Sequence, residues 1–239
     1  MGSPTRYKNG VTNVGATDPM RMLQIPDPTL MHVFYDDFDK YAAGDWTITT
    51  VGTGTTAITA LDGGAIVITN SAADNDARQH QHVANSFTLT PSKKCMFKAR
   101  FKVSDATQSD FLMGLATLDT TVLTAGGASA GDGVTDGVFF EKDDGSTAMF
   151  FNTQKNTTTG QTSATSIYTV VDDTFVIVAW YYDGKSSIEY YIDGVHKGTL
   201  DASSTYLPDA SLAVSFAIMN GEAVAKSMTI DYVLVANER

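Results

Sequence analysis

Apolar and polar residues alternate along most of the chain beyond residue 31, and this alternation is typical of β-strands with one buried face. The alternating runs are short, and Asp-Gly or Gly-Gly pairs separate several of them. The clearest strand runs from Lys94 to Val103, where basic residues and Met96 stand between apolar ones: Cys95, Phe97, Ala99, Phe101 and Val103. The pattern predicts a strand with one buried side and one basic side that faces solvent.

The strongest hairpin pattern lies at residues 174–194, TFVIVAWYYDGKSSIEYYIDG, where two β-rich runs meet at Asp183-Gly184. A turn centred on Gly184 and Lys185 would pair Tyr181 with Ile188. One face of the hairpin would then be wholly apolar. The opposite face would carry one aromatic and carboxylate set, namely Trp180, Tyr182, Glu189 and Tyr191.

That second face has two interpretations. An aromatic platform beside a carboxylate is how sandwich lectins stack and orient a sugar, so the face is a candidate glycan or partner site. Val176 and Val178 lie on the same side, however, and they favour a face that is buried under a loop or under the N-terminal arm. The sequence leaves both interpretations open.

Similar runs along the rest of the chain bring the expected total to about fourteen strands without a helix. In the last run, residues 226–235, strict alternation places Met228, Ile230, Tyr232 and Leu234 on one side. We therefore predict an all-β domain at residues 31–239, built as a two-sheet antiparallel β-sandwich of the jelly-roll kind. A chain of 239 residues fits one such domain.

Residues 1–30 differ from the domain, because they hold four of the six prolines and show no lasting periodicity. They predict an extended N-terminal arm. A frayed tail is the simpler interpretation of such a terminus. The arm nevertheless carries apolar residues that a solvated tail does not need, among them Met22, Leu23 and Ile25, which suggests that it docks onto something.

The formal net charge of −11 disfavours non-specific binding to nucleic acid or to an anionic membrane surface, so neither is an expected partner. Cys95 is the only cysteine, which excludes an intramolecular disulfide. The chain shows no apolar stretch long enough to span a membrane and no signal peptide. We expect a soluble protein that is made in a cytoplasm.

Candidate chemistry is sparse. Jelly-roll β-glucanases carry their catalytic carboxylates on one strand as Glu, a spacer, Asp, two spacers and Glu. The nearest string here, Glu141 to Gly145, lacks the second Glu and runs into a turn. Glu189 and Asp193 have the wrong spacing for such a pair. The sequence therefore predicts no catalytic residue and a protein that is not an enzyme, with a diverged polysaccharide hydrolase as the remote alternative.

One cluster could bind a metal, because His80 and His82 would share a face of a strand near Asp74 and Asp76. The spacing lacks the Gly and terminal Glu of a calcium loop. A solvated loop with histidines at a strand edge explains these residues better, and we predict no metal site and no cofactor.

Several longer stretches carry a resemblance to a known family: PTRYKNGVTNVGATDPMRMLQIPDPT in the arm, then HVFYDDFDKY, GGAIVITNSAADND, FKARFKVSDATQSDFLMGL, VTDGVFFEKDDGST and the closing IDYVLVANER. Together they resemble virion structural proteins of tailed bacteriophages, particularly those of marine short-tailed phages, over nearly the whole chain. Such proteins look like concanavalin A-like lectin jelly rolls. The calcium and sugar ligands of plant lectins have no matching motif in this sequence.

The resemblance implies a capsid decoration, or cement, protein on the virion surface, whose partners are the major capsid protein and neighbouring copies of itself. Binding of surface glycans by a head or tail-fibre module is the alternative. In the resemblance, Asp36, Asp37, Phe38, Asp231 and Tyr232 lie on paired terminal strands. The docking arm would include Arg6, Asn9, Gly10, Val11, Asn13 and Val14, to which the apolar pattern adds Met22, Leu23 and Ile25.

Overall fold

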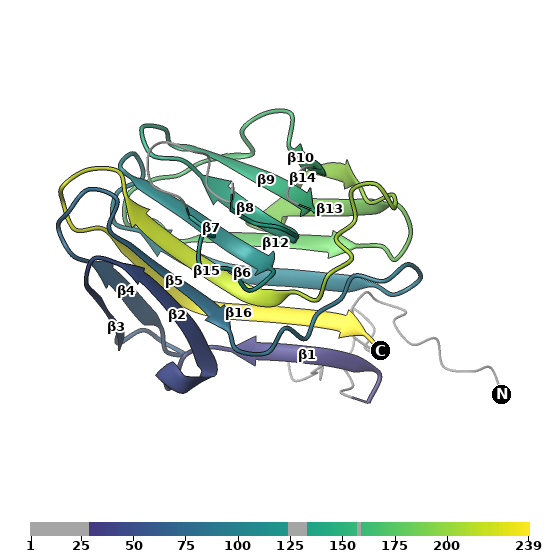
Figure 1. Ribbon diagram of the computed structural model, residues 1–239, viewed down its shortest axis with the longest axis horizontal. Helices are drawn as coiled ribbons and strands as arrows, with labels where there is room; N and C mark the ends of the chain where they lie inside the picture. Colours follow the sequence, from purple (N-terminus) through teal and green to yellow (C-terminus); the bar gives the residue numbers. More distant parts are fainter. Residues whose placement is uncertain (1–28, 124–132, 157–158) are drawn as a thin grey trace.

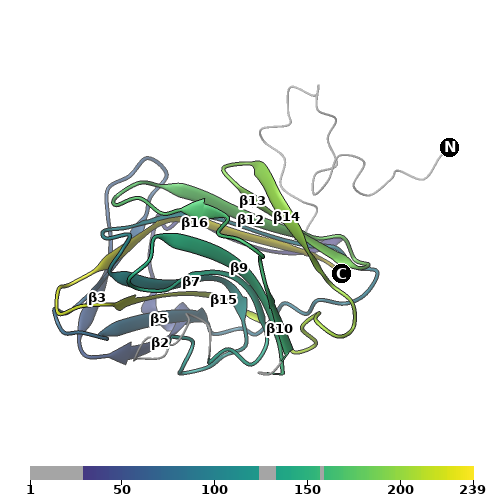
Figure 2. The same cartoon turned by 90° about the horizontal axis from the view of Figure 1, so that it is seen from above.

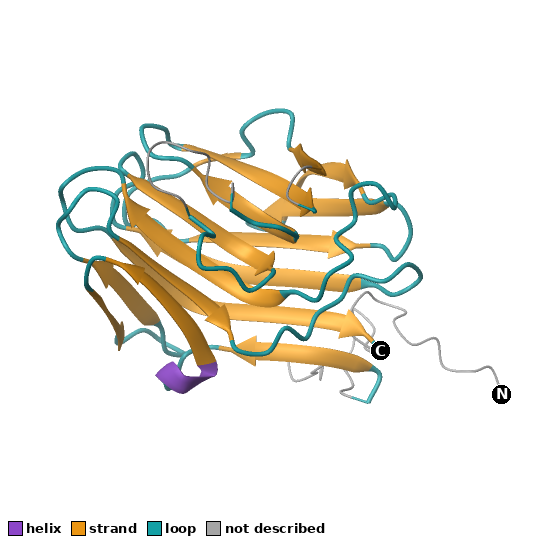
Figure 3. Ribbon diagram, in the orientation of Figure 1, coloured by secondary structure: helices purple, strands orange, loops and turns teal. Residues whose placement is uncertain are grey.

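The computed structural model describes residues 29–123, 133–156 and 159–239, and its regular structure is almost entirely antiparallel β-strand (Figure 3). Two eight-stranded sheets pack face to face, one in front of the other in Figure 1 and one above the other in Figure 2. The predicted all-β, two-sheet antiparallel sandwich is confirmed.

Sheet A has the strand order β14-β13-β12-β6-β16-β4-β3, and β1 also pairs with β16. Its strands are β1 (Met31–Asp36), β3 (Gly54–Ile58), β4 (Ile66–Asn70), β6 (Cys95–Val103), β12 (Val176–Tyr182), β13 (Ser187–Ile192), β14 (Val195–Asp201) and β16 (Ser227–Glu238). The strand β1 pairs with β16 near the two ends of the described chain. Of the residues that the resemblance implied for paired terminal strands, Asp36, Asp231 and Tyr232 lie on them, whereas Asp37 and Phe38 follow the end of β1.

Sheet B has the order β10-β9-β8-β7-β15-β5-β2, and β11 also pairs with β9. Its strands are β2 (Trp46–Val51), β5 (Ala77–His82), β7 (Ser109–Ala116), β8 (Gly137–Lys142), β9 (Ala148–Lys155), β10 (Thr159–Thr162), β11 (Tyr168–Thr169) and β15 (Ala213–Asn220). A short 3-10 helix, Ala43–Asp45, leads into β2. The chain passes repeatedly from one sheet to the other, so that strands distant in the sequence, such as β15, β7 and β5, are neighbours in sheet B, as in a jelly roll.

The main core lies between the sheets. Alternate residues of β6 point into it, so that the predicted buried side of this strand, from Cys95 to Val103, is confirmed. Phe97 stacks on Trp180 with ring centroids 6.1 Å apart, and Phe101 meets Phe111 of sheet B edge to face at 5.1 Å. Rings of this size contribute much of the hydrophobic free energy of such a core.

The register of the central hairpin differs by one residue from the prediction. Tyr181 pairs with Glu189, not with Ile188, and Trp180 pairs with Tyr190. The turn is longer than a two-residue turn because the Asp183 carboxylate accepts hydrogen bonds from the backbone N–H groups of residues 185, 186 and 187. A shift of one residue moves every side chain of the second strand to the other face.

The last strand also departs from strict alternation. Met228 and Ile230 are buried in the core, but the register of β16 against β6 shifts between Ile230 and Tyr232. Beyond this bulge Val233 and Val235 are the buried residues, while Tyr232 turns outward. The predicted shared face of Met228, Ile230, Tyr232 and Leu234 is therefore wrong in its second half.

The strand β5 shows no apolar alternation, because polar residues occupy both of its faces, and the sequence indicates a strand here only through the shared face of His80 and His82. His80 points into the core, where it stacks on Phe216 with ring centroids 5.3 Å apart. Gln79 and Gln81 point to the opposite side, the outer face of sheet B, and are also buried. Such a strand shows none of the apolar alternation from which strands are predicted.

Candidate functional site

The structure divides the predicted aromatic and carboxylate set between two faces of the hairpin. Trp180 is 1% exposed and Tyr182 is fully buried, and both belong to the core between the sheets. Glu189 and Tyr191 lie on the outer face of sheet A and are half-buried. The predicted common face is therefore wrong for Trp180 and Tyr182, and the physical reason is the one-residue shift in register.

The shift brings another aromatic residue beside Glu189. Tyr181 lies directly opposite Glu189 on β12, and Thr199 lies opposite it on β14. The next row outward holds Tyr191 opposite His196, with their ring centroids 5.3 Å apart. We call Tyr181, Glu189, Tyr191 and His196 the tyrosine face.

Hydrogen bonding and charge organise the tyrosine face around its carboxylate. The Tyr191 hydroxyl donates a hydrogen bond to Glu189 Oε2. Burial, followed by this hydrogen bond to the carboxylate, raises the pKa of Tyr191 to about 12. Ala179 lies opposite Tyr191 on β12 and carries only a methyl group, so one side of the Tyr191 ring has a small neighbour. The face offers two phenol rings around a fixed acceptor.

The basic side of β6 continues the outer face of sheet A. The Arg100 guanidinium lies 4.0 Å from the Phe175 ring centroid and is paired with Asp231. Lys102 is paired with Asp173 at 3.1 Å. These cations are largely neutralised by neighbouring carboxylates, so this part of the face does not attract anions strongly.

The outer face of sheet B carries Glu141, the residue closest to a glucanase pattern in the sequence. Glu141 is half-buried on β8, and the positions that share its face on this strand are Gly137 and Phe139. Glycosidases need two carboxylates, about 5–9.5 Å apart. The outer face of β8, over its described length, supplies one.

A loop between β7 and β8 covers the middle of the same face. Val122, Leu123 and Val134 pack on it in a second apolar cluster that includes Phe139. Gln81 fixes the loop by donating to the Thr117 carbonyl at 2.8 Å and accepting from the Asp119 N–H at 2.7 Å. A cavity of about 370 Å³ remains beside the loop, lined by Thr47, Leu118, Asp119 and Thr120.

The two histidines of β5, His80 and His82, pack against aromatic side chains. His80 accepts or donates a hydrogen bond with Thr56 Oγ1 at 3.0 Å, and burial lowers the pKa of His80 to about 3, so the ring is neutral. His82 packs against Phe34. Asp76 accepts a hydrogen bond from the Ser71 hydroxyl. Across the described ranges, no group of three or more His, Cys, Asp or Glu side chains is placed to hold a metal ion.

The predicted docking arm lies outside the described residues. This applies to each of its candidate residues, Arg6, Asn9, Gly10, Val11, Asn13, Val14, Met22, Leu23 and Ile25. In the part of the chain that is described, no helix has the length and apolar character that crossing a membrane requires.

Comparison with known proteins finds similarity to solved structures only. No protein-family model and no curated protein matches the chain. Among solved structures, an endo-1,3-β-glucanase from Streptomyces sioyaensis is similar with a TM-score of 0.60 at 14% identity, over 90% of this chain and 99% of that one. A glycoside hydrolase family 16 endo-glucanase from Bacteroides ovatus gives 0.55 at 15% identity, over 84% and 98%.

The carbohydrate recognition domain of Emp46p is also similar, with a TM-score of 0.54 at 8% identity, over 83% of this chain and 93% of that one. The fold is a concanavalin A-like jelly roll. Both glycan-binding domains and glycoside hydrolases are among the neighbours. The comparisons give no support to a phage capsid role, which stays a prediction from the sequence.

These neighbours correct the prediction that the chain is not an enzyme. Endo-glucanases share the fold over most of the chain, so a missing strand motif is not sufficient to exclude hydrolysis. The structural similarity establishes the fold, but at identities near 15% it does not establish the activity. The activity depends on the residues of this chain. The place to test for hydrolysis is Glu141.

Proposed function

We propose that this protein binds glycans through the tyrosine face on the outer side of sheet A. The observation that carries the proposal is the arrangement of Tyr181 and Tyr191 around the Glu189 carboxylate, on adjacent strands of a rigid sheet. Carbohydrate recognition and glucan hydrolysis by proteins of the same fold support it.

Each residue of the face has a chemical task in this proposal. The rings of Tyr181 and Tyr191 offer apolar surfaces on which the C–H face of a sugar ring stacks. Glu189 accepts hydrogen bonds from sugar hydroxyls, which are stronger for an ionised acceptor than for a neutral one. His196 and Thr199 form the rim, with Thr199 Oγ1 and His196 Nε2 3.4 Å apart.

Titration of the full chain with soluble β-glucan oligosaccharides, followed by calorimetry, tests the proposal. We expect Tyr191→Ala to weaken binding roughly tenfold, which corresponds to about 1.4 kcal/mol. Tyr206→Ala removes a half-buried tyrosine of a loop and should leave binding unchanged. Trp180→Phe, on the inner face of the same hairpin, should also leave it unchanged. Loss of binding in Trp180→Phe together with full binding by Tyr191→Ala would refute the proposal.

Hydrolysis can be read in the same samples. Release of reducing ends from the oligosaccharides that is abolished by Glu141→Gln would assign catalysis to the outer face of sheet B. Binding that depends on Tyr191 and is unaffected by Glu141→Gln locates recognition on sheet A. The two results are independent, because the residues lie on opposite sides of the sandwich.

A second candidate, capsid decoration, rests on the resemblance of the arm and of the terminal strands to phage virion proteins. In it, residues 1–30 dock on the major capsid shell and the sandwich stands on the virion surface, where the tyrosine face could meet host or environmental glycans. The decoration would stabilise the assembled shell by mass action. Co-sedimentation with heads that lack the protein tests this role. Saturation by the full chain and not by a chain without residues 1–30 supports it, whereas no binding by either contradicts it.

A further inference from the structure

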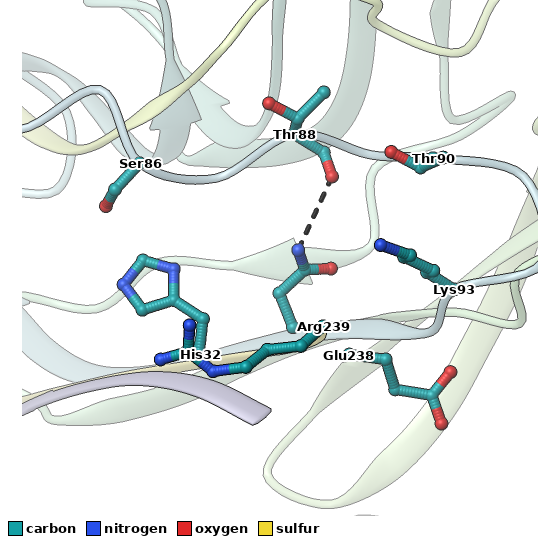
Figure 4. Close-up of a pocket in the computed structure, with 8 residues that line it drawn as sticks. His32, Ser86, Thr88, Thr90, Lys93, Glu238 and Arg239 are labelled. Carbon is teal, nitrogen blue, oxygen red and sulfur yellow. Dashed lines mark hydrogen bonds between the residues drawn. The ribbon is translucent and has the colours of Figure 1, made fainter. Parts of the chain in front are cut away.

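A polar pocket lies at the end of the sandwich where β1 and β16 meet the segment between β5 and β6 (Figure 4). Its volume is about 430 Å³, within the range of about 300–1,000 Å³ that small-molecule sites span. The lining residues are His32, Ser86, Thr88, Thr90, Lys93, Asn237, Glu238 and Arg239. None of them belongs to the tyrosine face.

Packing holds the walls of the pocket in place. The His32 ring stacks on Phe87 with centroids 4.5 Å apart and planes within 10°. Asn237 Nδ2 donates to the Thr88 carbonyl at 3.4 Å, the contact drawn as a dashed line in Figure 4. Arg239 Nε donates to the Met31 carbonyl at 3.4 Å. The pocket thus has walls from three separate segments that are tied to one another.

One acceptor in the pocket has no partner. Asn237 is 9% exposed, and its Oδ1 is buried without a hydrogen bond. A buried polar atom without a partner costs about 1–3 kcal/mol. This amide belongs to a lining residue of the pocket, so a turn of the side chain toward the cavity would let the oxygen accept from a ligand that brings a hydrogen-bond donor, such as a hydroxyl group.

The charge of the pocket is positive on the side of Lys93. The Lys93 ammonium forms no ion pair and no hydrogen bond with any described residue, and Figure 4 shows it extending into the pocket between Thr90 and Glu238. Glu238 also lines the pocket, and its Oε2 accepts the Lys94 N–H at 2.7 Å, which holds this carboxylate against the backbone of residue 94. Burial, with the charge of Arg239 second, lowers the pKa of His32, which is consistent with a positive local field.

We propose that this pocket binds a carboxylated sugar unit, of the hexuronate class. The ligand carboxylate pairs with the Lys93 ammonium, and a ring hydroxyl donates to Asn237 Oδ1. The hydroxyls of Ser86 and Thr90, which are exposed at the rim, complete a lining suited to a polyhydroxylated ring. A simple anion would form the ion pair with Lys93 but give no hydrogen bond to Asn237 Oδ1. A neutral sugar would give that hydrogen bond but no ion pair.

This site is independent of the tyrosine face, and it stands if the tyrosine face binds nothing. The three probes that separate its components are D-glucuronate, D-glucose and acetate. Glucuronate has both the carboxylate and the hydroxyls, glucose lacks the carboxylate, and acetate lacks the hydroxyls. Titration of the full chain, followed by amide chemical-shift changes at residues 86–93 and 237–239, reports binding at the pocket.

We expect glucuronate to saturate one site with a Kd of about 1 mM or below, and glucose and acetate to bind at least tenfold more weakly. Lys93→Met should weaken glucuronate binding at least tenfold, and Asn237→Leu should do the same. Because Asn237→Leu also removes the hydrogen bond from Nδ2 to the Thr88 carbonyl, thermal unfolding of this variant is measured alongside to establish that it is folded. Lys40→Met, at an exposed position in a loop, is the matched control and should not change the affinity.

Three results would overturn the inference. The first is the absence of saturable shifts with glucuronate. The second is equal affinity for acetate and glucuronate with the same loss in Lys93→Met, which would make the pocket a general anion site. The third is glucuronate binding that survives both Lys93→Met and Asn237→Leu, which would place the sugar elsewhere on the protein.

Discussion

Replacing Asp110 with asparagine should stabilise the protein at neutral and higher pH. Asp110, at the start of β7, is 3% exposed, and its Oδ1 accepts a hydrogen bond from the Asp144 N–H. Burial raises the pKa of Asp110 from 3.8 to about 7. Because the folded protein holds the proton more tightly than the unfolded chain, this group favours folding at low pH. That advantage is lost as pH rises from about 4 through 7.

The size of the effect follows from the shift. One pKa unit corresponds to 1.36 kcal/mol, so ionising Asp110 in the folded protein costs about 4 kcal/mol at most. An asparagine cannot ionise, and its side-chain oxygen can still accept the Asp144 N–H. Asp110→Asn should therefore raise the free energy of unfolding by roughly 2–4 kcal/mol at pH 8, with little change at pH 4.

Urea denaturation at pH 4, 6 and 8, followed by circular dichroism, measures this difference. Asp39→Asn makes the same chemical change at an exposed loop position and should shift the free energy of unfolding by less than about 0.5 kcal/mol at every pH. Parallel stability curves for the natural chain and Asp110→Asn, or a variant less stable at pH 8, would show that burial of this carboxylate does not govern the pH dependence.

Two further substitutions test the packing. Trp180→Ala should lower the free energy of unfolding by about 3–5 kcal/mol in urea titrations, because the ring is 1% exposed and stacks on Phe97. A loss below 1 kcal/mol would indicate that the ring is not in the core. Gly114→Ala on β7 should cost about 1–3 kcal/mol in thermal unfolding, since its Cβ would clash with the backbone of Val138 and Phe139 on β8. An unchanged melting temperature would show that the two strands can separate at this point.

The fold could be predicted from the sequence because most strands keep one apolar side. In β6 the alternation is complete, and burial follows it residue by residue. Hydrophobic periodicity fails to predict a strand whose polar side chains are buried under a loop. The strand β5 hides Gln79 and Gln81 under a loop whose backbone satisfies their amides, and such partners are invisible in the sequence.

The candidate site was predictable only in part, because its geometry depends on single-residue shifts. The chemistry of Glu189 and Tyr191 could be seen in the sequence, but the companion of Glu189 could not. That companion, Tyr181, is selected by the number of residues in the turn at Asp183, which side-chain capping lengthens. The pocket around Asn237 left no pattern, since its walls come from three segments distant in the sequence.

The division of the hairpin into an inner and an outer face has a consequence for how this protein can change over generations. Stability depends on inward residues such as Trp180 and Tyr182, whereas contacts with a ligand would depend on outward ones such as Tyr181 and Tyr191. Substitutions on the surface, outside the packed core, usually alter stability by less than about 0.5 kcal/mol. A lineage can therefore exchange one recognised surface for another by altering alternate positions along β12 and β13, while the inward positions preserve the same sandwich.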